Sequence, residues 1–404
     1  MKSTIMSLAV IAATTSACGG DTPGPGDTPF TVRAPTPVTG AWTSESAQAL
    51  GGEAEALGVD ASGHIVVVSQ GRALVDVFGT LEHRPLYAAP GEPVTMGAIQ
   101  TLRPRTDEGA WIGSDGGLFS IDRHFVTHSP LSERADDVID VAEAGPGPLE
   151  GIWMLSGQGL WRKSQGGLSE VQVDHAQARR IAIDTRARFA LLASDSALTL
   201  LQAKDGGMLA TEVRLPTGQI HGLSAAEGML WVASDTGLYS VDGSEWSHYP
   251  LGGEAVTAVA NDPSTGAAWA RSATTLYMVQ QDTVRAYTAS SDETGLAVDR
   301  LGDVFGLSQG ALFKRGTGAS DGNAVTFEQV QPWLSTHCSQ CHQNQTADFE
   351  DYEVFVERAE QALARVRSGD MPRCAGSVRC DADAALSAQD YAVLEQWIRD
   401  GMPQ

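Results

Sequence analysis

The segment WIGSDGGLFSID, residues 111–122, returns with few changes as WVASDTGLYSVD at residues 231–242. Each of these copies begins with a tryptophan, reaches a serine three residues later, turns, and continues with leucine and an aromatic residue. Degenerate copies extend the pattern, and its serines are Ser69, Ser114, Ser156, Ser194, Ser234, Ser272 and Ser308. Successive serines are separated by 36 to 45 residues, which is the length of one blade of a β-propeller.

The turns of each repeat indicate where its strands lie. Tight turns such as Ser-Asp-Gly-Gly at 114–117 join two short apolar segments, which is typical of a β-hairpin. An Asp-x-x-Gly turn precedes several copies, as at 60–63 and 299–302, and indicates a further pair of strands. Four strands in each of seven units predict an all-β seven-bladed propeller over residues 50–320.

The large and titratable side chains of the repeats suggest packing more than binding. The Trp or Phe that begins a copy is expected to pack between blades. His221, near the start of an inner strand, is either a residue that faces the central channel or a polar residue satisfied by its neighbours. His124 and His128 are four residues apart, which in a strand predicts surface histidines rather than a metal site.

The units WIGSDGGLFSID and WVASDTGLYSVDGSEW resemble the propeller repeats of extracytoplasmic two-component regulator sensors. The resemblance covers roughly residues 50–320. It implies a fold and leaves the ligand or partner of the propeller open.

Residues 338–342 read Cys-Ser-Gln-Cys-His, which is the attachment signature of a c-type haem. The two thiols would bond to the porphyrin vinyl groups, and His342 would ligate the iron. A thioredoxin-like redox pair would need a βαβ pattern around it, whereas a short helix is expected before Cys338. A zinc site would need a second pair of ligands at comparable spacing. The motif therefore favours haem.

The chain after a Gly- and Ser-containing linker at 316–323 turns helical. One amphipathic helix is indicated by apolar residues three and four apart, namely Tyr352, Phe355, Val356, Ala359, Leu363 and Val366. A last helix is capped by Ser387 and ends at Gly401, and its apolar face holds Tyr391, Leu394, Trp397 and Ile398. A small all-α domain over 325–404 is expected, and a covalent haem would supply much of its core.

This tail resembles small class I c-type cytochromes through PWLSTHCSQCH, RVRSGDMPR and LSAQDYAVLEQWIRDGMP. The resemblance implies one haem c, bound covalently at Cys338 and Cys341, with His342 and Met371 as the axial iron ligands. Met402, past the last helix, and His337, adjacent to Cys338, are poorer candidates for the iron. His–Met ligation saturates the iron and raises its reduction potential, as suits an electron carrier.

The first residues form an export signal. Lys2 and a short apolar stretch lead to Thr-Ser-Ala-Cys at 15–18, which resembles a lipoprotein signal with Cys18 as the lipidated residue. Thr15 departs from the usual Leu, and ordinary cleavage near Ala17 is the alternative. Residues 19–49 begin with a Gly-, Pro- and Thr-rich run that predicts an extended tether. The protein is expected on a bacterial cell-envelope membrane, in the periplasm or at the cell surface.

Two cysteines have neither lipid nor haem assigned to them. Cys374 and Cys380 either form a small disulfide, which an oxidising compartment permits, or remain free thiols. The net charge of −23, from 50 acidic and 27 basic residues, argues against binding nucleic acid. Such a charge would attract a cationic redox partner, although solubility is its commoner reason.

The expected function is therefore single-electron transfer by an exported monohaem cytochrome, with the propeller as a docking platform. An electron carrier is favoured over an enzyme. One alternative is a quinohaemoprotein-like dehydrogenase with pyrroloquinoline quinone in the propeller. The other is a haem-based redox or gas sensor, which needs a displaceable Met371. A dihaem peroxidase would need a second Cys-x-x-Cys-His motif, which the sequence lacks.

Overall fold

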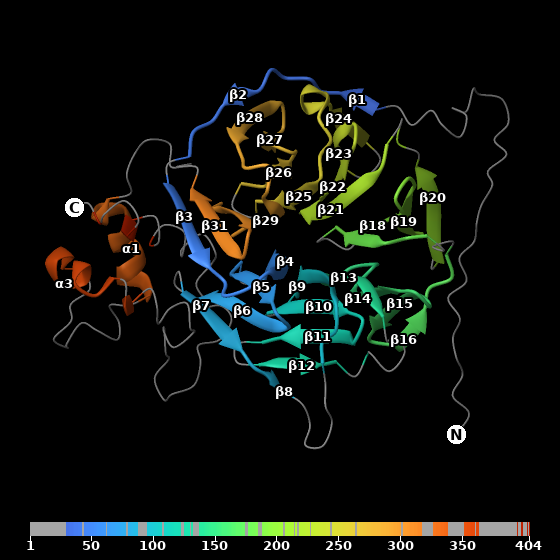
Figure 1. Cartoon of the computed structure of the whole chain (residues 1–404), viewed down its shortest axis with the longest axis horizontal. Coiled ribbons are helices and arrows are strands. Elements are labelled where there is room, and N and C mark those ends of the chain that lie inside the picture. Colours follow the sequence, from blue (N-terminus) through green and yellow to red (C-terminus); the bar gives the residue numbers. More distant parts are fainter. Residues whose placement is uncertain are drawn as a thin grey trace. The chain divides into compact units, whose positions relative to one another are not determined.

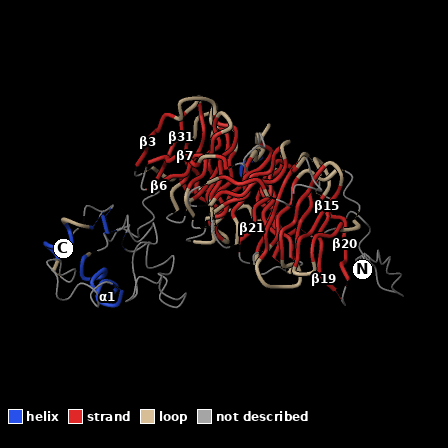
Figure 2. The backbone as a smooth tube through the Cα atoms, turned by 90° about the horizontal axis from the view of Figure 1, so that it is seen from below, coloured by secondary structure: helices blue, strands red, loops and turns tan. Residues whose placement is uncertain are grey.

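A computed structural model describes most of the chain. It covers residues 30–316 with short gaps, residues 326–337, residues 351–362 except 360, and Leu394, Trp397, Ile398, Met402 and Gln404. The chain divides into two compact units, Met1–Thr317 and Gly318–Gln404. Figure 2 shows that the strands belong to the first unit, and the described α-helices belong to the second.

The first unit is a seven-bladed β-propeller, which confirms the predicted all-β architecture (Figure 1). The first three blades follow one another along the chain, each an antiparallel sheet. Blade 1 holds β4 Ala54–Val59, β5 Ile65–Ser69, β6 Arg72–Val77 and β7 Thr80–Arg84. Blade 2 holds β9 Ile99–Pro104, β10 Ala110–Ser114, β11 Gly117–Ile121 and β12 Val126–His128, with β8 Leu86–Tyr87 added in parallel at its outer edge. Blade 3 holds β13 Val138–Ala144, β14 Gly151–Ser156, β15 Gly159–Ser164 and β16 Gly167–Glu170.

The remaining blades repeat the same four-stranded order. Blade 4 holds β17 Arg180–Ile183, β18 Phe189–Ala193, β19 Leu198–Lys204 and β20 Gly207–Val213. Blade 5 holds β21 Ile220–Ala226, β22 Met229–Ser234, β23 Gly237–Asp242 and β24 Glu245–Tyr249, and the short 3-10 turn η2 Leu251–Gly253 follows it. Blade 6 holds β25 Ala258–Asn261, β26 Ala268–Arg271, β27 Thr275–Gln280 and β28 Thr283–Thr288. Blade 7 holds β29 Thr294–Val298, β30 Val304–Ser308 and β31 Ala311–Gly316, and takes its fourth strand from elsewhere.

That fourth strand is β3 Ser44–Ala49, from the N-terminal part of the chain. It pairs antiparallel with β31 along its whole length, from Ser44 opposite Gly316 to Ala49 opposite Ala311. Before it, β1 Phe30–Val32 and β2 Val38–Thr39 add in parallel to β24 and β28. The described part of the predicted tether 19–49 thus belongs to the propeller. The composition argument missed this because these strands are held mainly by backbone pairing and little by burial of apolar side chains.

The periodic serine that revealed the repeat ends the second strand of a blade or directly follows it. In five blades its hydroxyl donates to a backbone carbonyl three residues on, as from Ser114 to Gly117 at 3.1 Å and from Ser234 to Gly237 at 3.1 Å. This bond closes the tight turn between the second and third strands, so the residue is needed once in each hairpin. Ser69 and Ser308 instead bond to Glu53 and Asp292.

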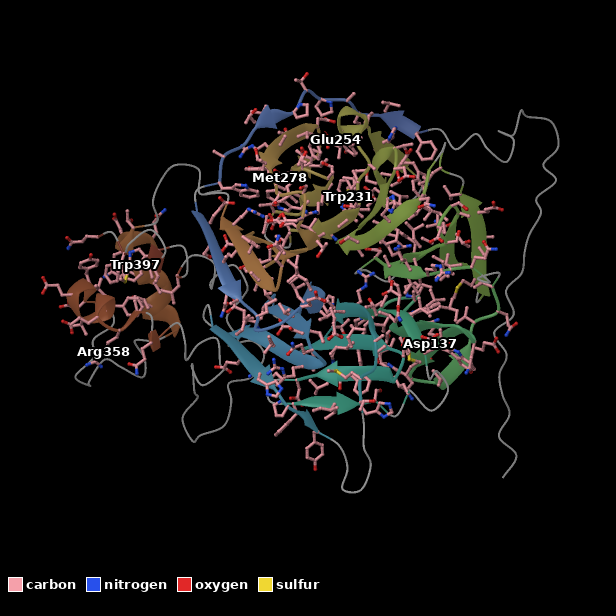
Figure 3. All side chains as sticks on the ribbon, in the orientation of Figure 1. Asp137, Trp231, Glu254, Met278, Arg358 and Trp397 are labelled. Carbon is pink, nitrogen blue, oxygen red and sulfur yellow. The ribbon has the colours of Figure 1, made fainter. Side chains whose placement is uncertain are left out.

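The aromatic residue of each repeat packs between blades, as predicted. Trp153 is fully buried among Ile181, Ile183 and Ala190 of the next blade. Trp231, labelled in Figure 3, packs in the same way against residues of blade 6. The four repeat tryptophans, Trp111, Trp153, Trp231 and Trp269, each remove a large apolar area from water at a junction, and such burial is the main force that holds adjacent blades together.

The described part of the second unit is helical. Its elements are α1 Phe327–His337 and α3 Tyr352–Val356, and Asp351 caps α3 by accepting the backbone N–H groups of Glu353 and Val354. Its core contains seven side chains that are at most 7 % exposed, namely Phe327, Val330, Leu334, Phe355, Ala359, Leu394 and Trp397. We name this set the C-terminal cluster. Among the described residues, no helix has the length and apolar character needed to cross a membrane.

Candidate functional site

The residues predicted to hold haem lie outside the described residues. These are Cys338, Cys341, His342 and Met371, and the same holds for Cys374, Cys380 and the lipidation candidate Cys18. Haem attachment, axial ligation, lipidation and the disulfide therefore stay predictions. Among the described residues, no group of three or more His, Cys, Asp or Glu could hold a metal ion.

The structure does describe the chain directly before the haem motif. α1 ends at His337, and its apolar residues Phe327, Val330 and Leu334 enter the C-terminal cluster. Trp397 stacks on Phe355 with ring centroids 5.5 Å apart, and Phe327 approaches the same indole at 5.6 Å. Three segments far apart in sequence thus share one apolar core, in which Figure 3 labels Trp397.

Met402, the second candidate for the iron in the sequence, is described. It packs against the C-terminal cluster, and its backbone N–H donates to the Trp397 carbonyl at 2.9 Å. Its own carbonyl accepts the Tyr352 hydroxyl at 2.8 Å. Met402 therefore has a structural role in joining the end of the chain to α3.

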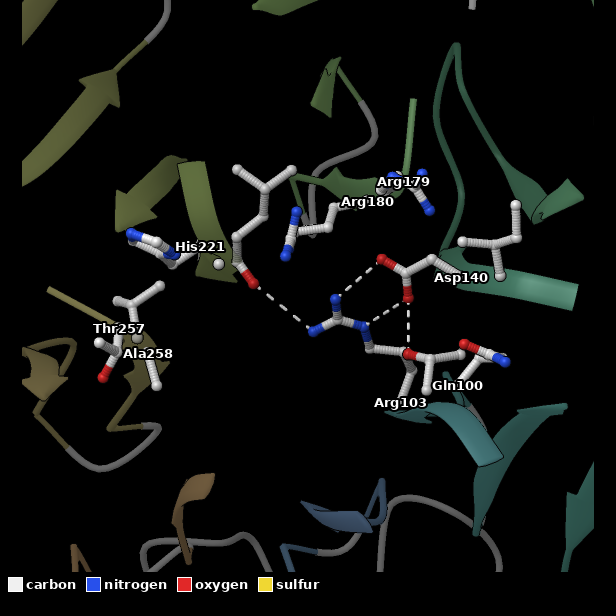
Figure 4. Close-up of a pocket in the computed structure, with 13 residues that line it drawn as sticks. Gln100, Arg103, Asp140, Arg179, Arg180, His221, Thr257 and Ala258 are labelled. Carbon is white, nitrogen blue, oxygen red and sulfur yellow. Dashed lines mark hydrogen bonds and ion pairs between the residues drawn. The ribbon is translucent and has the colours of Figure 1, made fainter. Parts of the chain in front are cut away.

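The propeller has a cavity of about 330 Å³ between the innermost strands of five blades, shown in Figure 4. Every lining residue belongs to one of these strands or directly precedes one. They are Gln100, Thr101, Arg103, Ile139, Asp140, Arg179, Arg180, His221, Gly222, Leu223, Thr257, Ala258 and Val259. We call this cavity the channel site, because the innermost strands of a propeller surround its central channel.

A recurring backbone feature shapes the channel site. The innermost strands β4, β9, β13, β21 and β29 each carry a β-bulge directly after their first residue. In β9, β13 and β21 the bulged residues are Gln100, Ile139 and His221, and all three line the cavity. A bulge leaves one residue unpaired and redirects its side chain, which is a common device next to binding sites.

Arg103 and Asp140 form the central ion pair of the channel site. Arg103 donates from Nε to Asp140 Oδ1 at 3.0 Å and from Nη2 to Asp140 Oδ2 at 2.9 Å. Burial disfavours the charge on Arg103, but Asp140 outweighs this effect and holds the pKa of Arg103 above its ordinary value. The guanidinium of Arg103 is thus already neutralised by the protein.

Arg179 and Arg180 have weaker partners. Arg179 Nε lies 3.7 Å from Asp195 Oδ2, and Arg180 Nη1 lies 3.8 Å from Asp195 Oδ1, both beyond hydrogen-bond distance. Burial lowers the pKa of Arg180 below its ordinary value, although the carboxylate of Asp195 acts in the opposite direction. Arg179 and Asp195 also line an adjoining cavity of about 400 Å³.

His221 lies where the sequence suggested, on β21 and in the wall of the channel site. Its Nε2 is 2.6 Å from Asp235 Oδ1 and donates to the ionised carboxylate, so the residue both faces the channel and has a partner. The bond from His221, together with one from the Gln219 backbone, lowers the pKa of Asp235. Of the other histidines, His128 contacts the Phe119 ring on blade 2, and His124 lies outside the described residues.

Reasoning from the sequence did not identify Arg103, Asp140, Arg179 or Arg180 as residues of a site. Each of them lies on the innermost strand of its blade or directly before it, and they share no sequence motif. They come together only because the blades form a ring. A signal was nevertheless present, because Arg179 and Arg180 form one of the few adjacent pairs of basic residues in a strongly acidic chain.

Comparison with known proteins supports the fold. No protein family and no curated protein matches the chain. Among solved structures, streptogramin B lyase is similar over 68 % of this chain and 99 % of its own, at 12 % identity and a TM-score of 0.53. The Pan2 WD40 domain of Neurospora crassa is similar over 70 % and 98 %, at 11 % identity and a TM-score of 0.53.

An extracellular domain of another protein is also similar. It belongs to a one-component system of B. thetaiotaomicron, with 14 % identity, a TM-score of 0.50, and coverage of 68 % of this chain and 40 % of that one. The propeller is thus similar in fold to the extracellular domain of a one-component system. At these identities the likeness concerns the fold alone.

Proposed function

We propose that this protein is an exported monohaem c-type cytochrome that transfers single electrons, with the propeller as its docking platform. One observation carries the proposal: the Cys-Ser-Gln-Cys-His motif at 338–342 follows α1 directly, in a unit whose described residues form a helical, apolar core. An apolar core of this kind is what a buried macrocycle requires beside it.

The donor set of the motif fits haem c. Two thiols and an imidazole within five residues match the covalent attachment and proximal ligation of that group. Cys338 and Cys341 would hold the macrocycle, and His342 and Met371 would hold the iron. When bound, the haem supplies a one-electron couple. The chain contributes the apolar C-terminal cluster, which excludes water and so tunes that couple.

The remaining parts of the proposal concern place and partner. Lipidation of Cys18 would anchor the protein in a membrane of the cell envelope, where haem c is attached in bacteria. The acidic surface, with a net charge of −23, would favour encounter with a cationic redox protein at low ionic strength.

The test is the optical spectrum of the full chain, produced in a host that attaches c-type haem. One covalent haem per chain is expected, with a weak far-red band from Met–iron ligation and no change when carbon monoxide is added to the reduced protein. Replacing Met371 by Ala should remove the far-red band, admit carbon monoxide and lower the potential, on the order of 100 mV of the ~0.8 V that axial ligands span.

The matched control is Met402→Ala, which should keep the band and the potential because Met402 packs against the C-terminal cluster. Prompt carbon monoxide binding by the unmodified protein would contradict the carrier and favour the gas sensor. Haem reduction by added alcohols or sugars that depends on pyrroloquinoline quinone would establish the dehydrogenase instead.

A further inference from the structure

We propose that the channel site binds a small organic anion through a carboxylate or phosphate group, with Arg180 as its main cationic contact. This inference concerns the propeller and goes beyond the electron transfer proposed for the C-terminal unit.

The first step compares the hydrogen bonds of two arginines in the channel site, Arg103 and Arg180. Arg103 makes two hydrogen bonds to Asp140 and a longer one of 3.5 Å to the Leu223 carbonyl. Arg180 differs, because its Nη1 is buried and has no hydrogen-bond partner among the residues that the structure describes. The side chain of Arg180 as a whole is 28 % exposed and lines the cavity, so an anion in the cavity can approach it at atoms other than the buried Nη1.

The second step is energetic. A guanidinium stays protonated in proteins, so a buried donor without a partner costs free energy in the empty site. The lowered pKa of Arg180 reflects the same effect, because burial opposes its charge more than Asp195 supports it. A bound oxyanion would place a negative charge beside the guanidinium of Arg180 and so offset the cost of its burial, and Arg179 would add a second positive charge nearby.

The third step concerns the class of ligand. The planar fork of an arginine matches carboxylate and phosphate oxygens. The residues that line the cavity include the partly buried apolar residues Ile139 and Val259, which suit the carbon skeleton of an organic molecule. Its volume of about 330 Å³ is at the small end of ligand pockets, which indicates a small molecule rather than a polymer.

The net negative charge of the whole chain bears on how an anion could bind at the channel site. With a net charge of −23 the protein repels anions at long range, so binding must come from local contacts. A cavity lined by several arginines is therefore unusual on this molecule. A rival explanation is that Arg180 serves only to neutralise the carboxylate of Asp195 on the surface. Asp195 is 60 % exposed, however, and an exposed pair at this distance contributes little.

The experiment is calorimetric titration of the full chain with succinate and, separately, with inorganic phosphate, at constant ionic strength set with chloride. Binding of either anion is expected, and the stronger one identifies the head group. Arg180→Gln should weaken this binding about tenfold or more, because it removes a charged hydrogen-bond donor. The matched control is Arg72→Gln, which removes the same charge from an exposed position in blade 1 and should leave binding unchanged.

A second variant keeps the test decisive if Arg180→Gln folds poorly. Ala258→Glu places a carboxylate on another wall of the same cavity, where it would take the place of the ligand. This variant should abolish binding and raise the thermal midpoint of the ligand-free protein. The proposal is overturned if neither anion binds, or if both variants bind as tightly as the unmodified chain. Because the readout is heat of binding, this result is independent of haem content.

Discussion

Asp140 is a buried carboxylate that accepts hydrogen bonds from both neighbouring blades. Its Oδ1 accepts from Thr101 at 2.6 Å and from Arg103 at 3.0 Å, both on blade 2. Its Oδ2 accepts from Arg103 at 2.9 Å and from the backbone N–H of Ile181 on blade 4 at 2.9 Å. One side chain on blade 3 thereby joins its two neighbours, at the same place where the channel site opens.

Replacing Asp140 by Asn should destabilise the propeller strongly. The change leaves the guanidinium of Arg103 largely buried without a counter-charge, and breaking a buried pair in this way costs about 3–5 kcal/mol. Urea unfolding of the full chain measures the loss. Asp195→Asn is the control, since Asp195 is exposed and its removal should cost less than about 1 kcal/mol. Equal effects of the two substitutions would show that the buried bonds of Asp140 do not hold the blades.

At the level of single residues, little of the channel site could be predicted from the sequence. His221 could be placed near the channel because the repeat gives the start of each inner strand. Arg103, Asp140 and Arg180 could not, because their meeting depends on the twist and closure of the whole ring. The haem motif has the opposite property, since its donors lie within five residues and need no tertiary structure to be recognised.

Strand β3 shows how the ring of blades is closed. Its partner β31 lies at the other end of the propeller sequence, and Arg315 on β31 donates to Glu45 on β3 at 2.6 Å. Arg315 also pairs with the buried carboxylate of Glu293, which accepts from Arg271 at 3.0 Å. Burial alone would disfavour the charge on Arg315, but its bonds to Glu293 and Glu45 raise its pKa above the ordinary value. The closing strand is thus fixed by backbone pairing and by a partly buried network of charges.

Deleting residues 1–49 behind a cleavable export signal should therefore destabilise the propeller. The truncation removes a strand paired at six positions, and at about 1 kcal/mol for each net hydrogen bond the loss is on the order of 5 kcal/mol. It also exposes β31 as a sheet edge, which favours aggregation. Thermal unfolding followed by circular dichroism measures the change. Deletion of residues 1–29 keeps β1, β2 and β3 and should leave the midpoint unaltered, and an equal midpoint for both truncations would disprove the closure.

Comparing β3 with the strands of the blades explains which strands could be predicted from the sequence. Within the blades, a serine recurs in every copy because each hairpin needs a turn, and a large apolar residue, aromatic in most copies, recurs because each junction is packed, so the repeat is visible. The sequence of β3, Ser-Glu-Ser-Ala-Gln-Ala, has no such residue and little apolar character. Its conformation is determined by β31, which is far away in sequence, and a local pattern cannot reveal that pairing.

The whole molecule combines two compact units with separate cores. The propeller holds most of the buried apolar residues, in clusters that each span neighbouring blades. The C-terminal cluster is small by comparison, with seven buried side chains among the described residues. If the proposed haem is attached there, it would supply much of the core of the second unit, so this unit should depend on the haem in a way that the propeller does not.

The double variant Cys338→Ala/Cys341→Ala tests this dependence in the full chain. Calorimetry of the unmodified protein should show two unfolding transitions, one for each unit, because separate cores unfold separately. Without the two thiols the haem cannot be attached, and the transition of the C-terminal unit should disappear together with its helical signal. The propeller transition should remain within about 2 °C of its original position.

The control Cys374→Ala/Cys380→Ala leaves the haem motif intact and should retain both transitions. A propeller transition that falls along with the haem would show instead that the two units are thermodynamically coupled, and would give the propeller a direct part in holding the cytochrome.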